Sequence, residues 1–156
     1  MHEPPLDHFG RPDSGTAFAF AATEAGVRSA MEKMRDVLRA HDLGAMNVGL
    51  AEIVLAETCN NIVEHAYDNT GNGEIKISLR YTGGLLIAEL TDWGKPMPGL
   101  EPPPKKTHDL DAALSDLPEG GFGWGLIRDM TSSLIYRRLE DRNFLRLMME
   151  MTPETP

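Results

Sequence analysis

The hydrophobic and polar positions of the chain change their period several times, and each change predicts a new element. Apolar residues alternate with polar ones, or run almost without a break, in five segments that are typical of strands. These predicted strands are residues 16–22, 75–81, 85–91, 134–140 and 144–151. Apolar positions recur at helical spacing in three further segments. These predicted helices are residues 24–41, 47–67 and 126–130.

Turn-forming residues separate these segments. Gly44 is a stop signal after the first helix, and Asn47 is a suitable N-cap for the second. The run DNTGNG at 68–73 ends that helix, and Gly83-Gly84 and residues 141–143 are hairpin connections. The order β-α-α-β-β-α-β-β predicts an α/β fold, with helices layered on one face of a mostly antiparallel sheet.

Composition restricts the class of protein. The chain has 156 residues, 41% of them hydrophobic, which suits one globular domain over 15–151. Residues 1–14 and 152–156 are expected to be a flexible arm and a tail. No secretory signal or membrane span is visible, and Cys59 cannot form an internal disulfide, so a reducing, cytoplasmic setting is expected. The net charge of −9 argues against nucleic acid as a partner.

A long irregular segment interrupts the pattern at about 93–120. It holds six prolines, and its only predicted regular structure is a short helix around 110–117. Segments of this length without regular structure are usually functional lids or binding loops. Lys105 and Lys106 are candidates for phosphate contacts within it, although a solvated pair is the commoner role for adjacent lysines.

The second helix carries a polar face that lacks lysine and arginine. At about 100° per residue, one face collects six polar side chains. They are Glu57, Asn60, Asn61, Glu64, His65 and Asp68. An ordinary amphipathic helix with its polar side in water explains such a face, but a face of carboxylates and amides also suits a metal or a polar ligand.

Two further patterns carry candidate chemistry. Asp92 ends the apolar strand and is followed by Gly94 and Pro96, so its carboxylate can accept a hydrogen bond from an amine, although the same residues can form a simple turn. The run GGFGWG at 120–125 precedes the last helix. Glycines there allow backbone N–H groups to converge on phosphate oxygens, whereas a flexible hinge is the alternative.

In this order the three patterns resemble the motifs of the GHKL (Bergerat-fold) ATPase superfamily. Glu57-x-x-x-Asn61-x-x-x-His65 resembles the N-box, and Asp92-x-Gly94-x-Pro96 resembles the first glycine box. The run 120–128 resembles the second glycine box in the variant of the RsbW and SpoIIAB anti-sigma-factor kinases. The resemblance covers roughly residues 16–150. It implies a two-layer α/β sandwich with a mixed, mostly antiparallel sheet and ATP held between helices and sheet.

The resemblance also implies roles for individual residues. Glu57 would be the catalytic base, and Asn61 would be the Mg²⁺ ligand. The nucleotide-binding set would be Asn61, His65, Asp92, Gly94, Pro96, Gly121, Gly123 and Gly125. The implied activity is that of an anti-sigma-factor serine/threonine kinase, a homodimer that uses Mg-ATP to phosphorylate a STAS-type anti-anti-sigma factor. Its other partner would be a sigma factor or an equivalent regulator.

Three other functions remain open from the sequence. One is a non-catalytic ATP- or ADP-binding module that sequesters a regulator, for which a base at Glu57 is unnecessary. Another is a histidine-kinase ATPase module without its phosphoacceptor, although no helix with a phosphoaccepting histidine precedes the domain and His41 lacks the neighbouring motif. The last is a structural α/β domain, which leaves the glycine run unexplained.

Overall fold

The computed structural model describes residues 15–103 and 123–151. One layer of the fold is a five-stranded sheet with the order β1-β2-β3-β5-β4, in which every neighbouring pair is antiparallel. Its strands are β1 (Thr16–Ala21), β2 (Glu74–Thr82), β3 (Leu85–Asp92), β4 (Ser133–Leu139) and β5 (Arg142–Glu150). All five match predicted strands to within two residues at either end. Gly83 and Gly84 both have positive φ, as the predicted tight hairpin requires.

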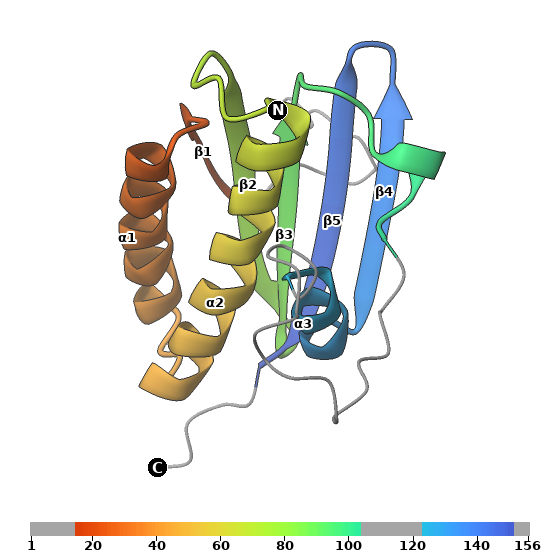
Figure 1. The fold of residues 1–156 in the computed structure, drawn as a ribbon. Coiled ribbons are helices and arrows are strands. Elements are labelled where there is room, and N and C mark those ends of the chain that lie inside the picture. Colours follow the sequence, from red (N-terminus) through yellow and green to blue (C-terminus); the bar gives the residue numbers. More distant parts are fainter. Residues whose placement is uncertain (1–14, 104–122, 152–156) are drawn as a thin grey trace, which may run out of the picture.

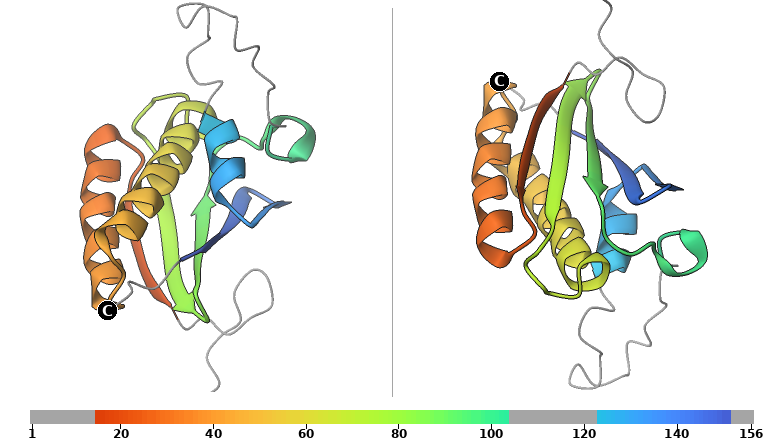
Figure 2. Two further views of the ribbon diagram at one scale, coloured as in Figure 1. Left: turned by 90° about the horizontal axis from the view of Figure 1, so that it is seen from below. Right: turned by 90° about the horizontal axis from the view of Figure 1, so that it is seen from above.

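The helices form the second layer, on one face of the sheet (Figures 1 and 2). They are α1 (Glu24–Ala40), α2 (Ala45–Asn61), the π-helical turn η1 (Ile62–Ala66) and α3 (Gly123–Met130). A short 3₁₀ turn, η2 (Pro98–Leu100), follows β3. Thr23 caps α1 by accepting a 3.0 Å hydrogen bond from the Gly26 N–H. The predicted two-layer α/β sandwich is therefore confirmed.

The hydrophobic core lies between the two layers. Side chains at helical spacing on α1 and α2 meet alternate residues of the central strands. The largest fully buried members are Met34, Leu38, Leu55, Ile75, Ile77, Leu79, Leu86, Leu90, Ile127 and Leu147. Cys59 is also fully buried in this core, where it packs as a small hydrophobic residue. None of the helices in the described ranges is long and apolar enough to cross a membrane.

Two helix starts were predicted wrongly. α2 begins at Ala45 with Gly44 as its N-cap, so Asn47 lies inside the first turn. Gly44 therefore precedes the second helix as its cap instead of ending the first. The chain leaves the first helix through Asp42, which has a φ of 59°. Aspartate tolerates this left-handed conformation better than most residues. α3 begins at Gly123, three residues before the predicted start, so Gly123 and Gly125 belong to the helix itself.

Candidate functional site

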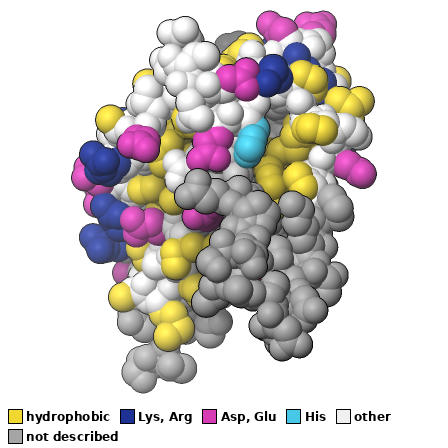
Figure 3. Space-filling view, in the orientation of Figure 1, with side chains coloured by type: hydrophobic (Ala, Val, Ile, Leu, Met, Phe, Trp, Pro, Cys, Tyr) yellow, Lys and Arg dark blue, Asp and Glu magenta, His cyan; other side chains and the backbone are white. Residues whose placement is uncertain are grey.

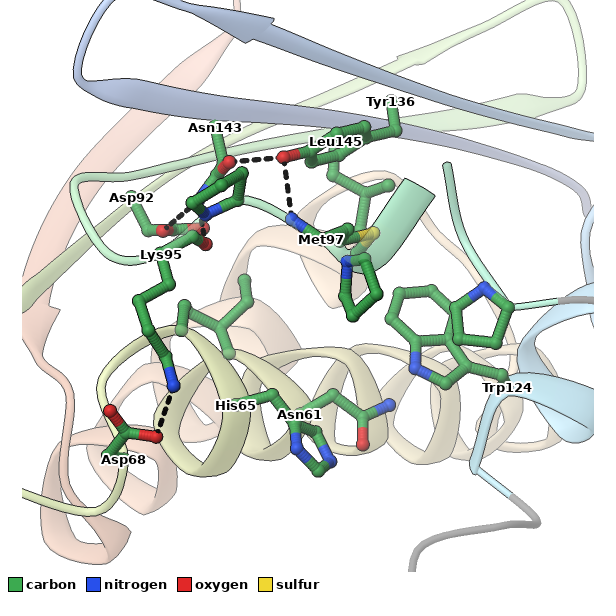
Figure 4. Close-up of a pocket in the computed structure, with 15 residues that line it drawn as sticks. Asn61, His65, Asp68, Asp92, Lys95, Met97, Trp124, Tyr136, Asn143 and Leu145 are labelled. Carbon is green, nitrogen blue, oxygen red and sulfur yellow. Dashed lines mark hydrogen bonds and ion pairs between the residues drawn. The ribbon is translucent and has the colours of Figure 1, made fainter. Parts of the chain in front are cut away.

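A pocket of about 610 Å³ opens between the end of α2 and the sheet (Figure 4). This volume lies in the range of small-molecule and cofactor sites. Its polar lining consists of Asn61, His65, Asp68, Asp92, Lys95, Tyr136 and Asn143. Its apolar lining consists of Ile62, Ala66, Pro96, Met97, Pro98, Pro103, Trp124 and Leu145. Mostly apolar walls with a few convergent polar groups are typical of ligand pockets.

Asp92 lies at one end of this pocket, where β3 ends. Asp92 is buried, with only 4% of the residue exposed. Asp92 Oδ1 accepts hydrogen bonds from Asn143 Nδ2 at 2.7 Å and from the Gly94 N–H at 3.0 Å. Asn143 is its direct partner across the β3–β5 pair. The carboxylate is therefore held in a defined orientation by the strand pairing itself.

A hydrogen-bond network extends from Asn143 along the pocket wall. The Tyr136 hydroxyl donates to Asn143 Oδ1 and accepts a 3.0 Å hydrogen bond from the Met97 N–H (Figure 4). Asn143 Nδ2 also donates to the Lys95 carbonyl at 2.8 Å, and Arg138 Nη1 donates to the Gly94 carbonyl at 2.7 Å. The segment after β3 is thus fastened to β4 and β5, and this fixes one side of the pocket.

Burial raises the pKa of Asp92 above its usual value. The hydrogen bonds from Asn143 and from the Gly94 N–H, together with the charge of Arg138, act in the opposite direction. An aspartate in this setting is well placed to accept a hydrogen bond from an uncharged amine of a ligand, because such a donor brings no extra charge into the buried site.

Gly94 packs against the end of the helix layer. A Cβ atom at this position would lie 2.4 Å from the Ala66 carbonyl oxygen, closer than real Cβ contacts allow. The next residue, Lys95, donates its backbone N–H to the same oxygen at 2.9 Å. Lys95 Nζ also forms a 2.7 Å ion pair with Asp68 at the exposed rim. The glycine is therefore required for the contact between the segment after β3 and η1.

The predicted continuous helix to residue 67 changes type at Ile62, where the π-helical turn η1 begins. The side chains of the polar face line two different hollows, one on each edge of the face. Asn61 and His65 line the pocket, whereas Asn60 and Glu64 line a separate groove beside α1. Turns of this kind occur often at functional sites. The opposite face of this helix is apolar, and its buried members include Leu55, Cys59, Ile62 and Val63.

Asn61 is the member of this face that is turned inward. It is 6% exposed, and among the described residues its Nδ2 is a buried side-chain nitrogen without a hydrogen-bond partner. A buried amide with unused hydrogen-bonding capacity is costly unless a ligand or water uses it. The amide of Asn61 therefore marks a place in the pocket wall where a polar ligand group fits.

Glu57 and Asn61 are both on α2, and their side chains lie beside Gly123 at the start of α3. A Cβ atom on Gly123 would be 3.1 Å from Glu57 Oε2 and 3.2 Å from Asn61 Nδ2. Glu57 is half-buried and is not among the residues that line the pocket. The structure thus brings the predicted base, the predicted metal ligand and one glycine of the second glycine box together, beside the pocket.

The other predicted site residues differ in how they lie relative to the pocket. His65 and Pro96 line the pocket, but the His65 side chain is 64% exposed and lies at its rim. Gly125 has open space beside it within α3. Gly121, Lys105, Lys106 and the predicted helix at 110–117 lie outside the described residues. Figure 3 shows acidic and hydrophobic side chains side by side at the centre of this face of the molecule.

Several residues of the pocket were not singled out from the sequence as site residues. They are Lys95, Met97, Trp124, Tyr136, Asn143 and Leu145. Lys95 was overlooked as a basic residue of the segment after β3, although it lies inside the Asp92-x-Gly94-x-Pro96 motif. Arg128 donates to the carbonyl oxygens of Pro102 and Pro103, at 2.8 and 2.7 Å, and thereby links α3 to the described start of the predicted lid.

Within residues 15–103 and 123–151, no group of three or more histidine, cysteine, aspartate or glutamate side chains is arranged to hold a metal ion. A metal here would depend on oxygens supplied by its ligand. This suits Mg²⁺, which is commonly held by one or two protein side chains together with phosphate oxygens.

Comparisons with known proteins agree with this geometry. The profile of the histidine kinase-like ATPase domain matches residues 20–149. The serine/threonine-protein kinase BtrW of Bordetella bronchiseptica is 32% identical over 102 residues, which cover 64% of this chain and 68% of BtrW. An anti-sigma F factor of Clostridium botulinum is 31% identical over 81 residues, which cover 52% of this chain and 54% of that relative. The match therefore spans only about half the length of the anti-sigma F factor.

Solved structures share the fold. The RsbU and RsbW domains of Rv1364c from Mycobacterium tuberculosis superpose with a TM-score of 0.61 at 15% identity, over 90% of this chain and 33% of that one. The catalytic domain of the histidine kinase ThkA superposes with a TM-score of 0.50 at 17% identity, over 90% of this chain and 98% of that one. The chain belongs to the histidine kinase-like ATPase domain family of the GHKL superfamily, and it is similar to a serine/threonine-protein kinase and to an anti-sigma F factor within it.

Proposed function

We propose that this protein is an anti-sigma-factor serine/threonine kinase of a bacterial partner-switching pathway. It binds Mg-ATP in the pocket and phosphorylates a serine of a STAS-type anti-anti-sigma factor. The observation that carries the proposal is the position of Gly123 against both Glu57 and Asn61. A candidate base and a candidate metal ligand meet there at the edge of a pocket whose far end holds the buried carboxylate of Asp92.

The nucleotide lies along the pocket in this proposal. Asp92 accepts a hydrogen bond from the adenine amino group, and Pro96 contributes to the apolar wall around the base. Gly94 keeps the chain close to η1 and so shapes that end of the pocket. The triphosphate extends toward α3, where Gly123 and Gly125 border it, and Gly121 keeps the phosphate-binding role that the resemblance implies. His65 lies at the rim between these two ends.

The residues present fit a magnesium ion. Held there, Mg²⁺ would neutralise the charge that develops during phosphoryl transfer. Asn61 offers the amide oxygen that would hold it, because rotation of the amide by about 180° exchanges the positions of its oxygen and nitrogen. The unused hydrogen-bonding capacity of this buried amide supports the assignment.

Glu57 acts as the base in the proposed transfer. Its carboxylate takes the proton from the substrate serine hydroxyl, the serine oxygen bonds to the γ-phosphorus, and the bond to the leaving oxygen of ADP breaks. Phosphoryl transfer depends mainly on positioning and charge stabilisation, and a positioned base contributes about 10²–10⁴-fold. A phosphate on the partner adds roughly 1.5–2 negative charges, enough to disrupt its interface with the kinase.

The proposal extends to partners. A sigma factor, or an equivalent regulator, is sequestered until an unphosphorylated STAS-type protein competes for the kinase. The name of the similar anti-sigma F factor supports the first partner. The serine/threonine kinase BtrW supports the activity. A cytoplasmic homodimer is proposed as the working form.

The test separates nucleotide binding from catalysis. Trp124 lines the pocket and is 8% exposed, so tryptophan fluorescence is a suitable signal for an ATP titration with and without Mg²⁺. Asp92→Asn should weaken ATP binding. Glu57→Gln should bind ATP like the wild type but transfer phosphate from labelled ATP to a STAS-domain protein of the same genome about 10²–10⁴ times more slowly.

A non-catalytic ATP- or ADP-binding module is the alternative function. It is favoured by the position of Glu57 outside the pocket lining. Saturable ATP binding with no phosphate transfer by the wild type to any STAS-domain protein of that genome would establish this alternative. If ATP binding itself is absent by both fluorescence and calorimetry, both proposals are wrong.

A further inference from the structure

One wall of the pocket is a proline-rich segment that belongs to no strand. We define the proline wall as residues 96–103. The members that line the pocket are Pro96, Met97, Pro98 and Pro103. The regular structure within the wall is limited to the short 3₁₀ turn η2. The position of the wall therefore depends on what fastens it to the rest of the fold.

The proline wall can donate few hydrogen bonds of its own. Four of the eight residues 96–103 are prolines, which have no backbone N–H. The Met97 N–H donates to the Tyr136 hydroxyl of β4 at 3.0 Å, and the Leu100 N–H is used within η2, where it donates to the Met97 carbonyl at 2.9 Å. The far end of the wall offers carbonyl oxygens, which need donors from another element.

Arg128 of α3 supplies those donors. Its Nε donates to the Pro103 carbonyl at 2.7 Å, and its Nη2 donates to the Pro102 carbonyl at 2.8 Å. A guanidinium holds its donors in a rigid planar fork, so two bonds to consecutive carbonyls fix both the distance and the direction of the chain. The proline wall is thus fastened at one end by Tyr136 on β4 and at the other by Arg128 on α3.

The same helix contributes a side chain to the pocket. Trp124 lines the pocket and stands four positions before Arg128, so both side chains project from one face of α3. Figure 4 shows Trp124 at the end of the pocket opposite to Asp92. Pro103 lines the pocket together with Trp124 and accepts a hydrogen bond from Arg128. Helix α3 therefore positions both the ring and the end of the wall beside it.

We infer that Arg128 is a positioning residue of the nucleotide pocket. It holds the proline wall in place and thereby sets how tightly the nucleotide is bound, without touching the ligand. The wall presents apolar side chains to the pocket, so it contacts the base and sugar and not the charged phosphates. Only the identity of the ligand rests on the proposed function, since the two hydrogen bonds of Arg128 are a property of the fold.

The first experiment compares nucleotide affinities. Arg128→Met keeps a long side chain but removes every donor, Arg128→Lys keeps a charged donor without the fork, and Arg39→Met makes the matched change at an exposed position in the last turn of α1. Calorimetry gives the Kd of ATP and of ADP. Arg128→Met should raise both values by the same factor, about tenfold, which corresponds to one hydrogen bond to a charged group. Arg128→Lys should be intermediate, and Arg39→Met should match the wild type.

Kinetics separate positioning from a purely structural role. In phosphate transfer to a STAS-domain protein, Arg128→Met should raise the KM for ATP far more than it lowers kcat, because weaker contact with the base affects the ground state and the transition state alike. If Arg128 only stabilised the fold, urea unfolding would shift to a lower midpoint while KM kept its wild-type value.

A second experiment needs no nucleotide. The chain has two tryptophans, so a Trp93→Phe background leaves Trp124 as the only source of tryptophan fluorescence. Loss of the two hydrogen bonds frees Pro103 beside this ring. Acrylamide should therefore quench Trp124 more strongly in Arg128→Met than in the parent protein, with Arg128→Lys between them. Urea unfolding of each variant checks that it is folded under the conditions of the measurement.

Wild-type Kd values in Arg128→Met would overturn the inference, whatever the quenching. A loss of affinity confined to ATP would also overturn it, because Arg128 would then act on the γ-phosphate. If the wild type bound neither nucleotide, the proposed function would be wrong, and the quenching measurement would still decide whether Arg128 positions the wall.

Discussion

Asn143 Nδ2 lies 2.7 Å from Asp92 Oδ1, and the two residues are direct partners across the β3–β5 pair. Asn143 thus connects the buried carboxylate of the pocket to the Tyr136 hydroxyl and to the Lys95 carbonyl. One amide side chain fixes both the acceptor that we assign to adenine and the backbone that follows it. Several properties of the site depend on this arrangement.

Asn143→Ala should destabilise the protein and weaken ATP binding together. The change leaves a buried carboxylate oxygen and the Lys95 carbonyl without this donor, which costs about 1–3 kcal/mol. Urea unfolding measures the stability, and a fluorescence titration measures the affinity. Tyr136→Phe is the matched variant, because it removes only the hydroxyl and should cost about 0.5–1.5 kcal/mol. Equal effects of the two changes would contradict a central role for Asn143.

Asp92→Asn should change how stability depends on pH. Burial raises the pKa of Asp92, so its contribution to stability is full below the unfolded-state pKa and is lost as pH rises through the folded-state pKa. The asparagine variant does not titrate there. As pH rises above about 4, the free energy of unfolding of the wild type should therefore fall relative to that of the variant. Parallel pH profiles, measured by urea unfolding, would refute this expectation.

Gly94→Ala should be strongly destabilising. The added methyl group would meet the Ala66 carbonyl oxygen at 2.4 Å, and overpacking of this kind costs about 1–3 kcal/mol. Gly49→Ala is the matched control, because nothing lies within 4 Å of a Cβ at this helical position. The control should gain about 0.5–1 kcal/mol. Thermal unfolding of both variants checks the pair, and a tolerated Gly94→Ala would show that the contact with η1 is adaptable.

Cys59 should be inert in the folded protein. Burial raises the pKa of its thiol to about 12, and only the thiolate reacts readily with disulfide reagents. In the wild type, thiol labelling should occur only as fast as the core opens, and it should become rapid in denaturant. Fast labelling under native conditions, checked against a Cys59→Ala protein that has no thiol, would show that α2 opens locally far more often than its packing suggests.

Most elements could be predicted because their signals are local. The alternation in β2 and the helical spacing in α1 arise from residues that are close in the sequence. The double glycine at 83–84 specifies its own hairpin, since both residues adopt positive φ. The helix starts were less predictable, because Gly44 and Asn47 both suit an N-cap and the choice between them depends on how α2 packs.

The candidate site was predictable in part for the same reason. Asp92, Asn61 and Glu57 stand in short motifs, and the structure places two of them in the pocket and the third beside it. The π-helical turn at Ile62–Ala66 was not predictable from periodicity, which assumes a constant 100° per residue. Periodicity also could not show that Asn61 and His65 line the pocket whereas Asn60 and Glu64 line a separate groove.

By itself, the sequence determined the elements, their order and the residues that carry chemistry, since period, turn residues and motifs are properties of neighbouring positions. Only the tertiary structure decided that Asp92 meets Asn143, 51 positions later in the chain, and that Gly94 touches Ala66. It also decided that Ile87 and Phe144 are buried on the face without helices. Strand register and burial result from contacts between distant segments, which no local pattern encodes.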